Sequence, residues 1–449
     1  MNPFYFCLKH NKMKKIKHIS LILLSINSLY GQNINGRYEG AVSRDGSVQL
    51  VSFDFYNEEG IQKGTYEIPE NGFFDVPIDD IKLINDTLHL KFYFGNFFCF
   101  ISENKKEITG ISEKWNPKIR LHIKESYKKE KPYAQKNITF QNGDIQLSGM
   151  LYKPRIEMRN TEKYVILVHG SGAQDRFSPY YISLAHRLSL EGFGVLLYDK
   201  RGTGKSSGNF ETASIENLAD DAVAAYNYLK ALNGRNQIEV GYLGTSQGGW
   251  IAPLAAKKVG DCDFLILNVG PAVSVFKQDL HRVEYSMNAD GWNQSDIDLA
   301  VAYTKLYFQF ATDKKENIWS KLQDLILEVK HKKWVEYVNI PKNKDDFDWW
   351  TNNNYDPETT LKNLNCRTLC LFGEFDPLVP PKENVKLMTE YLTTSKIKHE
   401  IKVIPGALHD MKSFQGLNGD NWNWPVVFWE WRSEPDEYMD SIIKFLDKN

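Results

Sequence analysis

The chain has 449 residues, longer than one ordinary domain, so about two or three folding units are expected. Apolar residues make up 42% and charged residues 25%, a composition that can bury a core and excludes a chain disordered by composition. The formal charge of -2 gives no electrostatic footprint for nucleic acid, and the mean hydropathy of -0.45 argues against a polytopic membrane protein.

Residues 1–31 have the pattern of a secretory signal peptide. A cationic stretch begins at Met13, a short apolar run follows it, and small residues lie near Gly31. The apolar run is shorter than the ~20 residues that cross a bilayer, and the alternatives are an uncleaved anchor or a buried helix. We expect translation to start at Met13 and cleavage near Gly31 to leave Gln32 or Asn33 as the first residue. The protein is then secreted or periplasmic, with no stable membrane span.

Five cysteines in a chain of this length do not make a disulfide scaffold. Cys7 would leave with the signal peptide, and no cysteine stands at the cleavage site for lipid attachment. The implied compartment is oxidising. The closest pair lies too near along one expected strand to form an easy bridge, so free, buried thiols are expected at Cys99, Cys262, Cys366 and Cys370.

Residues 33–127 are expected to form a small antiparallel β domain, either a sandwich or a barrel. Apolar and polar residues alternate in short runs such as 48–56 and 88–94, and turn signals separate the runs. The charged residues 128–136, which include Pro132, are interpreted as a linker.

From residue 137 to residue 449 the pattern changes to strands that alternate with helices. Near-continuous apolar runs are typical of strands buried on both faces, and a helix with one apolar face is expected from Ser214 to about Asn233. The alternation predicts an α/β fold in which helices cover both faces of a mainly parallel sheet. The apolar runs are 164–168, 194–198, 238–243, 264–267, 368–372 and 401–404.

The alternation of strands and helices breaks between Val269 and Cys366. Residues 295–337 are rich in aromatic side chains and predict about two or three amphipathic helices. We expect a helical cap over the ends of the strands, at about 274–360, which could shape a substrate pocket. The alternative is a packed group of helices with no role in binding. A closing helix is expected at 436–448.

Ser246 is the strongest candidate for a catalytic nucleophile. It lies in Gly244-Thr-Ser-Gln-Gly248, a G-x-S-x-G pattern that follows an apolar strand and precedes an expected helix. In that setting the glycines allow a sharp turn with close helix–strand packing, and the turn projects the serine hydroxyl outward. The alternative is a serine in an ordinary glycine-rich turn, which this setting disfavours.

A serine hydroxyl is a weak nucleophile that needs a base, and the base needs an orienting acid. Asp376 follows the expected strand 368–372, and His409 follows the strand that ends at Ile404, so the chain order is Ser, Asp, His. All three lie after the carboxyl ends of strands, where open α/β sheets bind ligands. Glu374 is the rival for the acid, and the motif favours Asp376.

Two backbone N–H groups are expected to bind the oxyanion that develops in acyl transfer. One belongs to Gln247, directly after the nucleophile. The other belongs to Ser171 in His169-Gly-Ser-Gly172, which follows the expected strand 164–168. His169 is expected to brace this loop rather than to take part in the chemistry.

The segment 198–206, Tyr-Asp-Lys-Arg-Gly-Thr-Gly-Lys-Ser, is similar to a phosphate-binding loop at first sight. The full pattern needs a glycine where Asp199 stands, so the segment fails as a nucleotide site. The sequence contains neither H-E-x-x-H nor paired C-x-x-C motifs. It therefore implies no cofactor and no metal.

Together these motifs resemble those of the α/β-hydrolase superfamily. Over about residues 136–449 the chain is similar to secreted bacterial esterases of the serine-hydrolase group that includes prolyl-oligopeptidase-like and serine-aminopeptidase-like enzymes. The resemblance implies the α/β-hydrolase fold, catalytic roles for the serine, aspartate and histidine, and a bracing role for the Asp199 loop, with Asp175 and Arg176 as its partners. The front β domain resembles the accessory domain of some of these esterases. The residues that carry the likeness are His169–Arg176, Asp199–Ser206, Gly244–Gly248, Gly373, Asp376 and His409.

The leading hypothesis is a serine hydrolase that cleaves carboxylic esters of small to medium acyl groups through an acyl-enzyme. The expected partner is a small-molecule ester, with no nucleic acid. The alternatives are a serine peptidase or aminopeptidase acting on short peptides, an acyltransferase with a different second nucleophile, and a non-catalytic binding protein built on a hydrolase scaffold.

Overall fold

The computed structural model describes residues 34–44, 47–69, 73–84, 87–92, 95–127, 130–155, 162–233, 238–347, 351, 353–413 and 434–448. The expected signal peptide, residues 1–31, lies outside the described residues. The chain divides into two compact units. Among the described residues, those within Met1–Tyr66 and Pro77–Lys128 form the β unit, and those within Glu67–Val76 and Lys129–Asn449 form the α/β unit.

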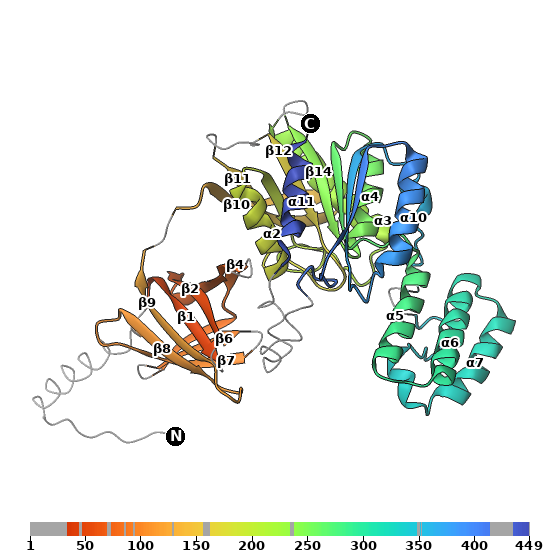
Figure 1. The fold of residues 1–449 in the computed structure, drawn as a ribbon, viewed down its shortest axis with the longest axis horizontal. Helices are drawn as coiled ribbons and strands as arrows, with labels where there is room; N and C mark the ends of the chain where they lie inside the picture. Colours follow the sequence, from red (N-terminus) through yellow and green to blue (C-terminus); the bar gives the residue numbers. More distant parts are fainter. Residues whose placement is uncertain are drawn as a thin grey trace, which may run out of the picture. The chain divides into compact units, whose positions relative to one another are not determined.

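The strands of the β unit belong to a nine-stranded sheet in the order β4-β3-β2-β1-β9-β8-β7-β6-β5 (Figure 1), in which β4 falls mostly in the segment Glu67–Val76 assigned to the α/β unit. Strand β1 pairs antiparallel with both β2 and β9, and the neighbours from β5 to β9 are also antiparallel. An antiparallel β domain is therefore present, as expected. The strands of the sheet are β1 Gly36–Arg44, β2 Ser47–Glu58, β3 Ile61–Ile68, β4 Phe73–Pro77, β5 Asp80–Ile84, β6 Thr87–Phe92, β7 Gly95–Ile101, β8 Glu107–Ser112 and β9 Arg120–Ser126.

Alternating burial along these strands builds the core of the β unit. In β6, Leu88, Leu90 and Phe92 are buried, and the residues between them are more exposed. The ring of Phe92 packs edge-on against Phe53 and Phe97, with centroid separations of 6.2 and 5.7 Å. The period-2 pattern thus places one apolar face of the sheet inside.

The α/β unit contains an eight-stranded sheet in the order β10-β11-β13-β12-β14-β15-β16-β17 (Figure 1). Strand β11 runs antiparallel to β10 and β13, and the strands from β12 to β17 run parallel. Their carboxyl ends, and the residues that follow them, therefore meet at one edge. The strands are β10 Tyr133–Asn142, β11 Ile145–Pro154, β12 Lys163–Val168, β13 Gly194–Tyr198, β14 Glu239–Thr245, β15 Phe264–Asn268, β16 Arg367–Gly373 and β17 His399–Ile404.

The structure differs from the expected linker at one point. Strand β10 begins at Tyr133, inside the segment 128–136. Residues 133–136 pair with the last residues of β11, from Leu151 to Pro154, so the β10–β11 hairpin starts four residues before the expected boundary at residue 137.

Helices cover both faces of the eight-stranded sheet. On one face, α3 (Ile215–Asn233), α4 (Gly248–Val259) and α10 (Pro381–Ser395) pack against inward residues such as Ile166 and Tyr242. On the other face, α2 (Pro179–Leu190) and α11 (Asp436–Asp447) pack against residues such as Val165 and Leu243. Strand β12 is buried along its whole length, which explains its continuous apolar sequence.

A group of helices is inserted between β15 and β16. The helices are α5 (Val275–Ala289), α6 (Gln294–Asp313), α7 (Glu316–Val329), η2 (Lys333–Tyr337) and α9 (Glu358–Leu361), and Figure 1 shows α5, α6 and α7 packed side by side. Helices α5, α6, α7 and η2 share an aromatic core in which Tyr303, Phe310 and Trp334 are buried. The expectation of amphipathic helices in this stretch is confirmed.

Two further sequence expectations concern thiols and membranes. Cys99, Cys262, Cys366 and Cys370 are free and buried, as expected. Within the described part of the chain, no helix combines the length and hydropathy that crossing a bilayer requires.

Candidate active site

Ser246 lies in a sharp turn between β14 and α4. Its φ of 53° is in the left-handed region, and its N–H donates to the carbonyl of Asn268 at 3.0 Å. A Cβ on Gly244 would lie 2.2 Å from the carbonyl oxygen of Gly248, and a Cβ on Gly248 would lie 2.3 Å from that of Val168. The helix therefore packs so closely on the strand that only glycine fits, which holds the serine in its uncommon conformation. This is the turn that the G-x-S-x-G pattern predicts.

His409 connects Ser246 to Asp376 through a continuous chain of hydrogen bonds. Its Nε2 lies 3.0 Å from Ser246 Oγ, and its Nδ1 lies 2.8 Å from Asp376 Oδ2. The other carboxylate oxygen of Asp376 accepts the backbone N–H groups of Leu378 and Val379, each at 2.8 Å. The Asp376 side chain is 0% exposed and the His409 side chain 22%, so a fixed acid orients an imidazole that reaches the surface. The structure thus brings these three predicted residues together.

Glu374, the rival for the acid, has a different place. Its side chain is exposed, and its carboxylate accepts the N–H of Gly406 at 2.8 Å. It therefore ties the loop after β16 to the loop after β17, while Asp376 is the carboxylate that contacts the imidazole of His409.

Ser171 and Gln247 line the same cavity as Ser246. The loop after β12 lies against the serine, since a Cβ on Gly170 would be 3.5 Å from the Cβ of Ser246. Gln247 is the N-cap of α4, where backbone N–H groups have no partner inside the helix. Within the described residues, neither the Ser171 N–H nor the Gln247 N–H donates a hydrogen bond. Both predicted donors are therefore available to a bound group.

His169 is buried behind this loop. Neither ring nitrogen has a hydrogen-bond partner among the described residues, and the ring packs edge-on against Tyr181 and Tyr198 at 4.6 and 5.4 Å. Burial holds the pKa of His169 well below its usual range, and the positive charge of Lys200 adds to this effect. A neutral, packed imidazole supports the loop by its shape, consistent with the expected bracing role.

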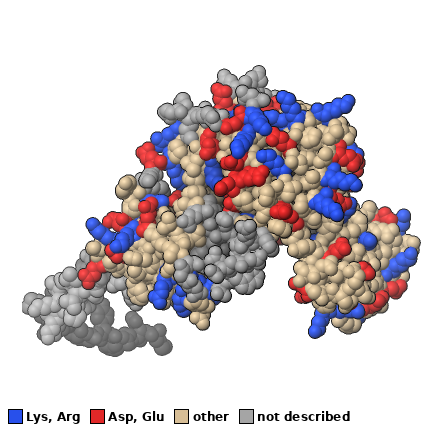
Figure 2. All heavy atoms as spheres, viewed as in Figure 1, with Lys and Arg blue, Asp and Glu red and all other residues tan. Residues whose placement is uncertain are grey.

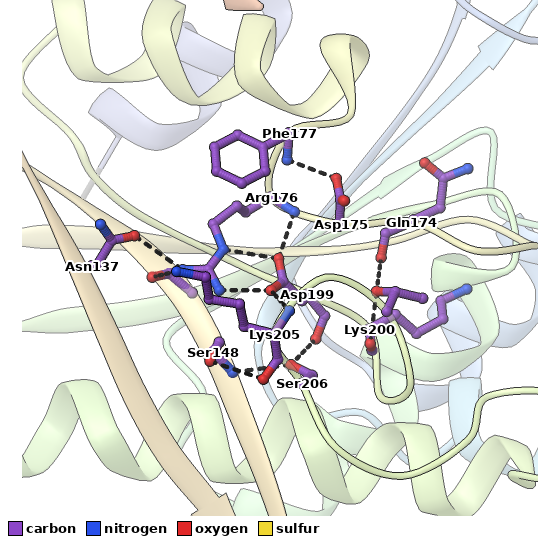
Figure 3. A network of polar contacts seen from close by, with 12 residues as sticks. Asn137, Ser148, Gln174, Asp175, Arg176, Phe177, Asp199, Lys200, Lys205 and Ser206 are labelled. Atoms are coloured by element: carbon purple, nitrogen blue, oxygen red, sulfur yellow. Dashed lines mark hydrogen bonds and ion pairs between the residues drawn. The ribbon is translucent and has the colours of Figure 1, made fainter. Parts of the chain in front are cut away.

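A buried ion pair between Arg176 and Asp199 joins the loop after β12 to the loop after β13 (Figure 3). Nη2 of Arg176 lies 2.6 Å from Oδ2 of Asp199, and Nε lies 2.9 Å from Oδ1. The backbone N–H of Lys205 donates to the same carboxylate at 2.8 Å. A Cβ on Gly204 would lie 2.4 Å from Asp199 Oδ2, so the carboxylate fills the loop that looked like a phosphate cradle. This agrees with the bracing role that the resemblance implies.

A cavity of about 170 Å³ opens beside Ser246 and His409. Its polar side comes from α5, where Asp279 accepts a hydrogen bond from Nε of Arg282 at 2.7 Å. Nη2 of Arg282 donates to the carbonyl of Tyr337 at 3.0 Å. The rest of the lining is mainly apolar and includes Trp250, Pro271, Val275, Leu378 and Val379, with Gln278 beside them.

Sequence reasoning missed the α5 residues of this cavity and two supports of the Ser171 loop. The hydroxyl of Tyr181 accepts the N–H of Gly170 at 2.6 Å, and Nζ of Lys200 donates to the carbonyl of Gly170 at 2.5 Å. Lys200 lies within the 198–206 segment, so its position beside Asp199 in that motif could have marked it as a candidate support. Tyr181 carries no comparable signal, because it is one apolar-face residue of an ordinary helix.

Residues 159–325 match the sequence model of the family described as "Serine aminopeptidase, S33". The matched stretch contains Ser246 and ends before Asp376 and His409. The chain is also 29% identical over 119 residues to the quorum-quenching protein AidA of Acinetobacter baumannii. That alignment covers 26% of this chain and spans 38% of the length of AidA.

Solved structures of esterases are similar to this chain. For an esterase of Pyrococcus furiosus the identity is 18%, the alignment covers 70% of this chain and 91% of the other, and the TM-score is 0.44. For a carboxyl esterase of Bacillus coagulans the identity is 19%, the coverage is 70% and 98%, and the TM-score is 0.44. The strand order and the turn at Ser246 are those of the α/β-hydrolase fold, and the family match over residues 159–325 agrees with that fold.

Proposed function

We propose that this chain is a serine hydrolase that cleaves carboxylic esters through an acyl-enzyme. The observation that carries the proposal is the hydrogen-bonded chain from Ser246 through His409 to Asp376, at the mouth of a cavity. Such a chain activates a hydroxyl that is otherwise a weak nucleophile.

In the proposed reaction, Ser246 Oγ attacks the acyl carbon while Nε2 of His409 takes its proton. Asp376 accepts the Nδ1–H and stabilises the imidazolium. The backbone N–H groups of Ser171 and Gln247 bind the oxyanion of the tetrahedral intermediate. His409 then passes the proton to the leaving alcohol, and a water activated by the same imidazole releases the acid.

The polar side of the cavity favours an ester over a peptide with a free amino terminus. Capture of an ammonium group calls for a carboxylate that is free to pair with it. Asp279 is the carboxylate in the cavity lining, and the guanidinium of Arg282 already pairs with it. The match to the serine aminopeptidase family therefore supports hydrolase chemistry. It does not by itself favour an aminopeptidase substrate, because the carboxylate in the cavity lining is already paired.

The size of the cavity supports short acyl groups. Its 170 Å³ is close to the ~150 Å³ of a cavity that holds benzene. We expect kcat/KM for p-nitrophenyl esters to rise from acetate to butyrate, because each buried methylene contributes ~0.8 kcal/mol, and to fall by the dodecanoate. Val275→Ala, which enlarges the cavity, should move the maximum of kcat/KM to an ester with a longer acyl chain. A maximum at the dodecanoate in the native protein would contradict the assignment of this cavity.

The test of the proposed function compares an ester with an amide and maps the nucleophile. The native protein should hydrolyse p-nitrophenyl butyrate much faster than alanine p-nitroanilide. A fluorophosphonate probe should label Ser246, as located by peptide mass spectrometry. No ester hydrolysis together with no labelling would revive the non-catalytic binding protein. Preference for the aminoacyl amide would instead favour the peptidase.

The orienting role of Asp376 gives a separate prediction. Asp376→Asn should lower kcat for p-nitrophenyl butyrate by about 10⁴-fold, because the amide stabilises the wrong tautomer of His409. The matched control is Glu374→Gln, two residues away, which should stay within ~3-fold of the native kcat. The reverse ranking of the two variants would assign the acid to Glu374.

We propose that the helical insertion between β15 and β16 acts as a cap over the cavity. Val275, Gln278 and Arg282 of α5 line the cavity, which supports a capping role for the helical insertion.

In Figure 2, basic and acidic side chains of the described residues are interspersed on the face shown, consistent with a small-molecule substrate rather than nucleic acid. The signal pattern in residues 1–31 supports secretion or a periplasmic location.

A further inference from the structure

Lys200 places a buried cation behind the loop that carries Ser171. It follows β13, and its ammonium donates to the carbonyl oxygens of Gly170 at 2.5 Å and Gly172 at 3.0 Å. A third bond, of 3.1 Å, joins it to Oε1 of Gln247. A lysine ammonium has three protons, so every proton has an acceptor.

These acceptors belong to the two segments that supply the proposed oxyanion donors. The carbonyl of Gly170 and the N–H of Ser171 are part of one planar trans peptide, so they point in opposite directions. A bond that draws the Gly170 oxygen toward Lys200 therefore aims the Ser171 N–H away from Lys200. The bond to the Gln247 side chain fixes the residue that carries the second donor. One ammonium thus connects both halves of the oxyanion site.

The same contact also acts electrostatically. A cation on a carbonyl oxygen polarises the peptide and makes its N–H a stronger donor. The Gly170 N–H is held separately by the hydroxyl of Tyr181, so the peptides on both sides of Gly170 are fixed. The loop is thereby organised before substrate binds, which is what stabilisation of a developing charge requires.

We propose that Lys200 is a positioning residue that orients and polarises the Ser171 N–H toward the oxyanion and holds the side chain of Gln247, whose backbone N–H is the second donor. The proposal rests on the proposed hydrolase function. Lys200 touches no substrate atom in this scheme, so its removal should weaken binding of the transition state and leave ground-state binding unchanged.

Lys200→Met, of similar length and without charge, tests the proposal on p-nitrophenyl butyrate. Removal of an oxyanion donor costs ~10²- to 10³-fold in kcat, and a misdirected donor should cost less. We expect kcat to fall by about 10- to 100-fold, with KM within ~3-fold of the native value. Affinity for a trifluoromethyl ketone, whose adduct with Ser246 carries an oxyanion, should fall by about the same factor as kcat.

The matched control is Lys205→Met, the same substitution at an exposed lysine of the same loop, which should leave kcat and inhibitor affinity unchanged. If Lys200→Met does not fold, Gln247→Leu removes one of the three bonds, keeps the backbone N–H, and should lower kcat in the same direction. Unchanged kcat and inhibitor affinity in the folded variant would overturn the proposal. A loss confined to KM would do the same. An inactive, unlabelled native protein would instead refute the hydrolase function itself.

The charge of Lys200 makes a pH readout possible. Burial lowers the pKa of Lys200 to about 7, so the ammonium is present below that pH and lost above it. The side chains that face it are His169 from the loop after β12, Gln247 from the N-cap of α4 and the Phe210 ring from the loop after β13. In the native protein kcat should decline above about pH 7, and in Lys200→Met this decline should be absent. An identical decline of kcat in both proteins would show that loss of the Lys200 charge is not its cause, and would contradict the electrostatic part of the proposal.

Discussion

Ser246→Ala is expected to lower kcat for p-nitrophenyl butyrate by about 10⁴- to 10⁶-fold while the fold is retained. The substitution deletes the hydroxyl that His409 contacts at 3.0 Å, and with it the acyl-enzyme route. Alanine keeps the Cβ, so the backbone strain at φ of 53° is unchanged. The remaining activity should come from the cavity and the oxyanion donors acting on a water molecule.

The control for this substitution is Ser295→Ala, on the exposed face of α6, which should match the native protein. Combining Ser246→Ala with His409→Ala should add almost nothing to the single loss, because the two residues act as one unit. Native-like ester hydrolysis by Ser246→Ala, checked in protein purified away from host esterases, would end the acyl-enzyme scheme. Additive losses in the double variant would separate His409 from the serine.

The sequence anticipated the sheet and the three hydrogen-bonded residues for a common reason. Each signal was local: a continuous apolar run marks a strand buried on both faces, and the motif after it marks the loop at the strand's carboxyl end. Parallel pairing then brings those loops together, although Ser246 and His409 lie 163 positions apart. Long-range contact followed here from topology rather than from any feature of the intervening sequence.

The cavity lining and the role of Lys200 required coordinates. The apolar pattern of the insertion shows which helix faces are buried but not what they face, so Val275 and Arg282 gave no sign of lining the site. The three bonds of Lys200 reach loops after two other strands, at separations of 28 to 47 residues. The linker boundary was misjudged because residues 133–136 become strand only by pairing with β11.

Asp199→Asn is expected to destabilise the α/β unit by about 3 to 5 kcal/mol, the second large effect. Asparagine keeps the volume and removes the charge, which leaves the Arg176 guanidinium, 3% exposed, without its ion partner. The loss is large because a buried charge that was paired becomes uncompensated. The substitution should also weaken the contact of this loop with β11, because Arg176 donates to the carbonyl of Gly149 at 2.8 Å.

Urea unfolding followed by tryptophan fluorescence measures this loss, because Trp250 and Trp334 are buried in the α/β unit. The matched control is Asp220→Asn, which breaks a pair with Lys258 whose side chains are 44% and 34% exposed. That surface pair should contribute ~1 kcal/mol or less. If Asp199→Asn unfolded at the same urea concentration as Asp220→Asn, the buried pair would not be what holds the loops after β12 and β13 together. The Ser171 loop would then depend on its other contacts, which include those of Lys200 and Tyr181 with Gly170 and that of Thr203 with Gln174.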